Sequence, residues 1–111
     1  MEESEARFRQ LYNEAPVGYH EIDEQGRITS VNQTELDMLG YRREEMIGEY
    51  VWKFVADSEA SCERVLAKLA GLSQESVAAE RLYRKKDGEV LTVLIDERIE
   101  RDTTGRVKTI R

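Results

Sequence analysis

Two side chains in this sequence could do specialised chemistry: the single histidine, His20, and the single cysteine, Cys62. An imidazole can ligate haem iron or change its charge near neutral pH, so His20 is a candidate haem ligand or pH-sensitive contact. A lone histidine on a strand more often forms a simple hydrogen bond or lies at the surface. One cysteine cannot form a disulfide within the chain. One histidine and one cysteine also cannot build a metal site of the usual composition.

The usual catalytic and nucleotide-binding motifs do not occur in the sequence. It contains no phosphate-binding loop, no paired-glycine fingerprint, and neither an HExxH nor a CxxC motif. Its many carboxylates are spread over expected helix faces and loops, which is typical of a solvated surface. We therefore expect a non-catalytic chain without a metal site.

The length and charge of the chain set further limits. Its 111 residues suffice for one domain with a modest core. The net charge of −6 argues against a nucleic-acid-binding surface, which needs a basic face. No apolar run approaches the ~20 residues of a membrane span, and the acidic start is unlike a signal peptide. The unpaired Cys62 fits a reducing compartment, so we expect a cytoplasmic location.

Residues 1–14 predict an amphipathic helix that flanks a core domain over residues 15–111. Phe8, Leu11 and Tyr12 recur at helical spacing and form one apolar stripe. Such a stripe needs a covering surface, which is either the sheet of the same domain or a second copy of the chain. We expect a homodimer with these three residues at its interface.

The stretch Asp23–Gly48 predicts a hairpin followed by two short helices. Gly26 can take the positive φ of a tight turn between two short strands. Asn32 is placed to cap the first helix, because its side chain can accept hydrogen bonds from unpaired backbone N–H groups. Gly40 stands where that helix should end.

The last third of the chain predicts strands. Ser76–Arg84 and Val90–Ile95 form a hairpin around Gly88, and a further strand begins at Val107. Because Val90–Ile95 carries apolar side chains on both of its faces, we expect the strand to be covered on both sides. The helical core is one cover, and the N-terminal helix is the candidate for the other.

Several short blocks match the pattern of a known family in order and spacing. They are Ala15-Pro16-Val17-Gly18, Asp23-x-x-Gly26-Arg27-Ile28, Val31-Asn32, Leu39-Gly40-Tyr41, Glu44-Glu45-Met46-Ile47-Gly48 and Arg84-Lys85-Lys86-Asp87-Gly88. Over nearly its whole length the chain thus resembles the PAS sensor family. The resemblance implies an α+β fold, with a five-stranded antiparallel sheet, short helices on one face and an N-terminal flanking helix. It also implies a short helical turn over 49–55, although these residues favour a strand by propensity.

The resemblance further implies a space between the helices and the sheet, part of it formed by a longer helix over 59–70. The candidate lining residues are His20, Trp52, Phe54, Val65, Leu66 and Leu69. This mostly apolar set suits a small apolar ligand, and core packing explains it equally well. The long helix carries no histidine where haem-binding relatives have theirs. The flavin-linked relatives carry a reactive cysteine where this chain reads 48–51 without one, and Cys62 is expected to be a small core residue. Neither haem nor a flavin adduct is therefore expected, and any cofactor is unknown.

The same resemblance places Glu45 beside Lys86 as an ion pair between the second small helix and the second hairpin. It implies a sensory, signal-transducing module of a larger protein, such as a two-component sensor histidine kinase or a cyclic-dinucleotide enzyme. The module would relay ligand or conformational state through a dimer and contact the other domains of its parent. The alternative is a ligandless dimerisation module. Since the last strand of relatives runs on into an exit helix, we expect this chain to be excised from a longer protein.

Overall fold

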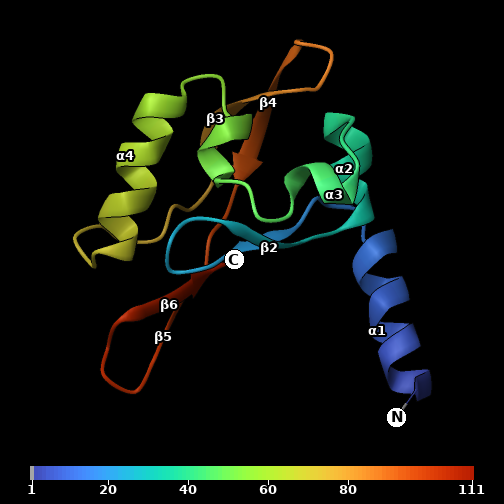
Figure 1. The fold of residues 1–111 in the computed structure, drawn as a ribbon, viewed down its shortest axis with the longest axis horizontal. Coiled ribbons are helices and arrows are strands. Elements are labelled where there is room, and N and C mark those ends of the chain that lie inside the picture. Colours follow the sequence, from blue (N-terminus) through green and yellow to red (C-terminus); the bar gives the residue numbers. More distant parts are fainter. Residues whose placement is uncertain (1) are drawn as a thin grey trace.

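The computed structural model describes residues 2–111, with side chains from Ser4 onward, and Figure 1 shows the arrangement of its elements. The helices are α1 (Glu2–Glu14), α2 (Gln33–Leu39), α3 (Arg43–Met46), the 3-10 helix η1 (Val51–Phe54) and α4 (Ser58–Leu69). The strands are β1 (His20–Ile22), β2 (Ile28–Val31), β3 (Ala79–Arg84), β4 (Val90–Ile95), β5 (Ile99–Arg101) and β6 (Val107–Ile110). The predicted α+β class is confirmed, including the helical turn at Val51–Phe54.

All strand pairs are antiparallel, in the order β2-β1-β6-β5, with β3 paired to β4. The described chain has six strands where the sequence predicted five: β4 has the predicted bounds, and β5 is an additional strand between β4 and β6, separated from β4 by residues 96–98. In that gap the N–H of Glu97 donates to the carbonyl of Ser76 at 2.9 Å. The N–H of Arg98 donates to the carbonyl of Arg111 at 2.9 Å. These contacts replace the ladder bonds that a continuous strand would make.

Local signals explain the turn from β2 into α2. The side chain of Asn32 accepts a hydrogen bond from the N–H of Glu35, which satisfies an N–H that lacks a partner in the first helical turn. Gly40 ends α2 with φ of 81°, and its N–H donates to the carbonyl of Leu36. A left-handed backbone is readily available to glycine, so the helix stops where the sequence predicted.

The core lies between the inner face of the sheet and the helices α2, α3, η1 and α4. Ile28, Val31, Leu36, Leu39 and Phe54 are almost fully buried there. The ring of Phe54 meets the ring of Tyr41 edge to face at a centroid distance of 4.9 Å. This geometry is favourable for aromatic pairs, because the positive edge of one ring meets the negative face of the other.

The N-terminal helix does not cover the outer face of its own β3–β4 hairpin. Figure 1 shows α1 (blue) projecting beside α2, far from the β3–β4 hairpin. On the outer face of the hairpin, Leu82 and Val90 are exposed, and Leu94 is 71% exposed. Of the two covers that the sequence left open for this strand, α1 of the same chain is therefore not the one observed. The reason is that the last turn of α1 is held by α2 and by β2, through a hydrogen bond between Tyr12 and Ser30.

Candidate functional site

The interior of the domain contains an imidazole–carboxylate pair. Nδ1 of His20, on β1, lies 2.9 Å from Oε2 and 3.0 Å from Oε1 of Glu35, on α2. The side chain of His20 is 23% exposed and that of Glu35 is 8% exposed, so the carboxylate is the more buried partner. Gly18 leaves room for it, because a Cβ on Gly18 would lie 3.3 Å from Oε1 of Glu35.

The position of Glu35 depends on a hydrogen-bonding centre at Asn32, which is 0% exposed. Its Oδ1 accepts from the N–H of Tyr19 at 2.9 Å and from the N–H of Glu35 at 3.1 Å. Its Nδ2 donates to the carbonyls of Tyr12 and Val17, each at 2.9 Å. One side chain thus joins the end of α1, the start of β1 and the first turn of α2.

A second buried pair links α4 to the segment between β4 and β5. Lys68, on α4, contacts the carboxylate of Glu97 in the link between β4 and β5, and the Lys68 side chain is 5% exposed. The Nζ of Lys68 also donates to Oγ of Ser76 at 2.8 Å. The N–H of Ser76 donates to Oε1 of Glu97 at 3.1 Å. The pair therefore fixes the end of α4 to the interruption in the sheet.

Burial and neighbouring charges shift several pKa values in this interior. Burial favours the neutral imidazole of His20, but the charge and hydrogen bond of Glu35, with the charge of Glu97, outweigh it and hold the pKa of His20 above 6.5. Burial also favours the neutral carboxyl of Glu97. Hydrogen bonds from Lys68 and Ser76 outweigh that effect, so the pKa of Glu97 lies below 4.5. Burial, helped by the charges of Glu35 and Glu97, raises the pKa of Tyr83 well above its usual range.

The predicted lining residues do not all face one space. Phe54 and Val65 are buried in the core, and Leu69 packs against it. The indole of Trp52 stacks on Tyr50, with centroids 4.6 Å apart, and covers the β1–β2 turn. Leu66 is 49% exposed, so its assignment to the interior is wrong.

The buried face of α4 differs by about one position from the predicted one. Ser61, Val65 and Lys68 are the buried residues of this helix, while Cys62 is only partly buried. Sequence reasoning missed Lys68 because a lysine is rarely fully buried unless it is paired. The available signal was its spacing of three from Val65, on the same face of the helix.

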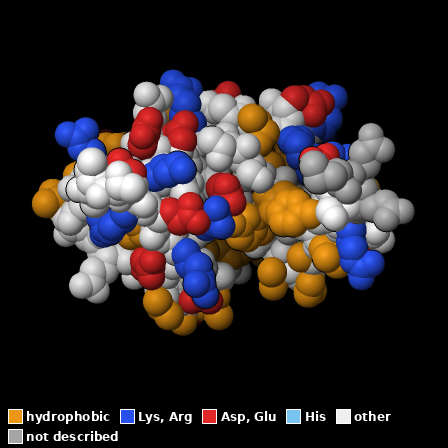
Figure 2. Space-filling model, turned by 90° about the horizontal axis from the view of Figure 1, so that it is seen from below, with side chains coloured by type: hydrophobic (Ala, Val, Ile, Leu, Met, Phe, Trp, Pro, Cys, Tyr) orange, Lys and Arg blue, Asp and Glu red, His pale blue; other side chains and the backbone are white. Residues whose placement is uncertain are grey.

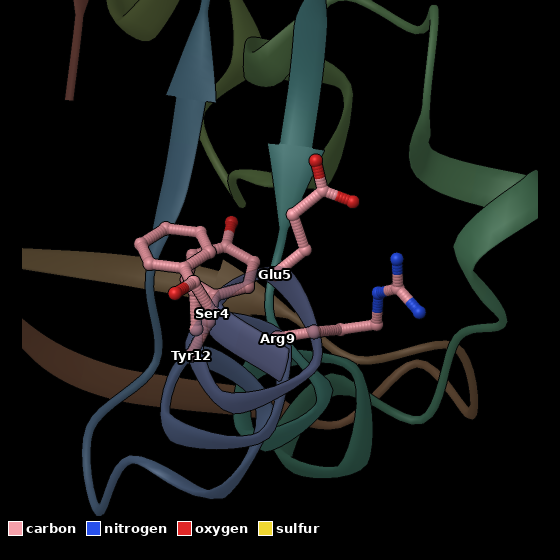
Figure 3. Close-up of a pocket in the computed structure, with 5 residues that line it drawn as sticks. Ser4, Glu5, Arg9 and Tyr12 are labelled. Carbon is pink, nitrogen blue, oxygen red and sulfur yellow. The ribbon is translucent and has the colours of Figure 1, made fainter. Parts of the chain in front are cut away.

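The three residues predicted for a dimer interface all lie on α1, but their environments differ. Phe8 is 68% exposed and Leu11 is 62% exposed. Tyr12 is partly buried and stacks on Phe8 with ring centroids 6.0 Å apart. A pocket lies along α1, and Figure 3 draws the side chains that line it: Ser4, Glu5, Phe8, Arg9 and Tyr12. Figure 2 shows hydrophobic side chains gathered on part of one face of the molecule, with charged side chains mixed over the rest.

The structure brings together Glu45 and Lys86, the two residues expected to form an ion pair. The Nζ of Lys86 lies 2.8 Å from Oε2 and 3.0 Å from Oε1 of Glu45. The hydrogen bond from Lys86, with another from the N–H of Arg42, holds the pKa of Glu45 below its ordinary value. The N–H of Lys86 also donates to the carbonyl of Leu39, so the second hairpin is anchored to the end of α2.

The described part of the chain holds neither a metal-binding cluster nor a membrane-spanning helix. From residue 2 to 111, no three histidine, cysteine, aspartate or glutamate side chains are grouped as a metal site would require. None of the described helices combines the length and apolar character needed to cross a bilayer.

Comparison with known proteins agrees with this architecture. The family model of the PAS domain matches residues 16–111. The PAS domain of an HTR-like protein from Haloarcula marismortui is 27% identical, with a TM-score of 0.80 over 98% of this chain and 88% of that one. A domain of the sensory box sensor histidine kinase/response regulator from Geobacter sulfurreducens is 22% identical, with a TM-score of 0.69 over 96% and 91% of the two chains. The LOV protein of Rhodobacter sphaeroides is 13% identical, with a TM-score of 0.73 over 99% and 64%.

No curated protein matches the sequence. The family model, in contrast, covers most of the chain and includes all the strands described above. Together with the fold, this match establishes the family that the sequence blocks indicated: the chain belongs to the PAS domain family.

Proposed function

We propose that this PAS domain is a signal-relay module of a larger signalling protein, such as a sensor histidine kinase or a cyclic-dinucleotide enzyme, and that it works as a homodimer in the cytoplasm. The similar domain from Geobacter sulfurreducens belongs to a sensor histidine kinase, which supports this type of parent. The proposed role is to transmit a conformational state rather than to catalyse a reaction.

The observation that carries the proposal is a pair of exposed apolar surfaces in different parts of the fold. One is the α1 stripe, defined by Phe8 and Leu11, and the other is the outer sheet patch, defined by Leu82, Val90 and Leu94. Monomeric proteins seldom expose large contiguous apolar surfaces, and such surfaces commonly mark association sites. In a two-fold symmetric pair, the α1 stripe of each copy can pack on the sheet patch of the other.

The interior supports a relay more than a ligand sensor. Among the described residues, every fully buried side-chain nitrogen and oxygen has a hydrogen-bond partner. The charged groups Lys68 and Glu97 satisfy each other in the region that the sequence predicted to be apolar. Ligand sensing is the second candidate function, and it follows from the family resemblance. Native mass spectrometry and an absorption spectrum of the purified protein test it, because a co-purifying metabolite or chromophore would select the sensor.

Sedimentation velocity at micromolar concentrations tests the homodimer. We expect the wild-type chain to sediment as a dimer, and we expect either Phe8→Ser with Leu11→Ser or Leu94→Ser alone to shift it towards the monomer. Each of these side chains is mostly exposed in the single chain, so the fold should survive. Leu66→Ser is the matched control, because Leu66 is an exposed leucine on α4, outside both surfaces. A monomeric wild type, or equal effects of the control, would contradict the proposed dimer.

A further inference from the structure

We propose that His20 and Glu35 form a proton-binding site that controls how firmly α1 is held on the domain. His20 is the only imidazole in the sequence. Its Nδ1 contacts both oxygens of Glu35, at 2.9 and 3.0 Å, inside the fold. The inference goes beyond the relay function proposed above and does not depend on dimerisation.

The geometry makes the pair sensitive to a single proton. A protonated imidazole donates from Nδ1 to the carboxylate and also neutralises its charge. When His20 loses the proton, the buried carboxylate keeps at most a neutral hydrogen bond, and a buried charge without a compensating charge is unfavourable. Glu35 must then shift towards water or draw water into its surroundings. Each of these changes disturbs the first turn of α2.

Other titratable groups interact electrostatically with the pair. The charge of Glu97, from the link between β4 and β5, adds to that of Glu35 in raising the pKa of the imidazole. Burial raises the pKa of the phenols of Tyr12, on α1, and Tyr83, on β3, and the charge of Glu35 helps to raise both. Both phenols are therefore neutral throughout the range in which His20 titrates. His20 is the group whose charge changes near neutral pH.

The disturbed turn of α2 is the one that holds α1. Within it, Nδ2 of Asn32 donates to the carbonyl of Tyr12 at 2.9 Å. Oγ1 of Thr34 donates to the carbonyl of Ala15 at 2.5 Å. Because the N–H of Glu35 donates to Oδ1 of Asn32, a displacement of Glu35 acts directly on these contacts. The coupling is reciprocal, so a firmly held α1 raises the proton affinity of His20.

The sign of the pH dependence follows from the raised pKa of His20. Stabilisation by the pair is fully present below pH 6.5, the ordinary pKa of histidine, and is lost as the pH rises through the higher pKa of the folded state. We therefore expect α1 to be held more firmly at mildly acidic pH and to loosen as the pH rises.

NMR titration of the single histidine tests the site in the intact chain. We expect the pKa of His20 to lie above 6.5 in the wild type. In Glu35→Gln it should fall below 6.5, because burial still disfavours the charged imidazole while the carboxylate is gone. Glu45→Gln is the matched control, since Glu45 pairs with Lys86 on another part of the fold, and it should leave the titration unchanged. A wild-type pKa at or below 6.5 would overturn the proton site.

Amide hydrogen exchange in the last turn of α1, residues 11–14, tests the control of docking. After correction for intrinsic exchange, we expect protection to fall several-fold as the pH rises through the pKa of His20. His20→Gln keeps a polar side chain but cannot titrate, so its protection should not change over this range. Circular dichroism of each variant confirms the fold. If wild type and His20→Gln show the same dependence on pH, the pair does not control α1.

Discussion

The indole ring of Trp52 packs against Gly26 so closely that a methyl group on Gly26 would lie 2.6 Å from Cζ3 of the indole. Gly26 also has φ of 87°, a conformation that side chains disfavour. Gly26→Ala therefore combines backbone strain with overpacking, and we expect it to lower the free energy of unfolding by about 2–4 kcal/mol. Urea unfolding measures the change.

Gly88→Ala is the control for this substitution. Gly88 has a similar φ of 93°, but no atom lies within 4 Å of its would-be Cβ. Only the backbone strain applies there, so we expect the free energy of unfolding to fall by about 1 kcal/mol. Equal losses at the two positions would show that the contact with Trp52 adds nothing.

The buried pair of Lys68 and Glu97 should be sensitive to the loss of either partner. We expect Lys68→Met to destabilise the fold by about 3–5 kcal/mol, because it leaves a buried carboxylate without its counter-ion. Replacing both residues, as in Lys68→Met with Glu97→Leu, should recover most of the loss. Chemical denaturation of the two single variants and the double variant measures the coupling. Additive losses would contradict a direct interaction.

The pH dependence of unfolding gives a second test of this pair. The pKa of Glu97 is held below 4.5 in the folded state. The stabilisation of the fold by its ionised carboxylate is therefore present above pH 4.5 and is lost as the pH falls through this lower pKa. In Lys68→Met the hydrogen bond and the charge of Lys68 are lost, and we expect burial to outweigh the hydrogen bonds that remain from Ser76 and to raise the pKa of Glu97. The ionised Glu97 should then lower the free energy of unfolding instead of raising it. As the pH falls, the variant should therefore become more stable relative to the wild type. Denaturation of wild type and variant between pH 3 and pH 7, about the range of this titration, shows the difference.

Local sequence signals predicted most of the elements because their causes are local. The N-cap at Asn32, the helix end at Gly40 and the hairpin turn at Gly26 each depend on one residue and its neighbours along the chain. The interruption between β4 and β5 has no such cause. It depends on hydrogen bonds from the link to residues distant in sequence, such as that between Glu97 and Ser76.

The candidate site was harder to predict because hydrophobicity alone does not decide which residues are buried. On α4, Val65 belongs both to the predicted face with Leu66 and to the observed face with Lys68. Hydrophobicity favoured Leu66, but the charge of Lys68 is compensated by Glu97, which lies 29 positions away in the sequence. For the same reason His20 was recognised as a candidate pH-sensitive group, while its partner Glu35 was not.

His20 should be dispensable for any binding of haem. Its Nδ1 is engaged by Glu35, and the carboxylate stabilises the protonated imidazole, which cannot ligate iron. Titration of the protein with haem, followed by absorption, should show no low-spin Soret shift that depends on this residue. His20→Ala serves as the comparison. A tight low-spin complex in the wild type that is lost in the variant would contradict this prediction.

Replacing the side-chain amide of Asn32 by a carboxyl group of nearly the same shape should destabilise the fold. In Asn32→Asp the carboxylate can still accept from Tyr19 and Glu35, but it cannot donate to the carbonyls of Tyr12 and Val17. Two carbonyls then lose their donor and face a negative charge, so we expect a loss of about 2–4 kcal/mol in the free energy of unfolding. Protonation of the new carboxyl restores one donor, so the loss should shrink as the pH falls.

The same substitution at Asn13 provides the control. There Oδ1 accepts hydrogen bonds from the N–H of Gln33 and from Arg43, each at 3.0 Å, and a carboxylate can accept both. Asn13→Asp should therefore change the free energy of unfolding by no more than about 0.5 kcal/mol. Urea denaturation of both variants at neutral and acidic pH separates the two cases. If both substitutions have the same effect, donation by Asn32 to the end of α1 is not what holds this junction together.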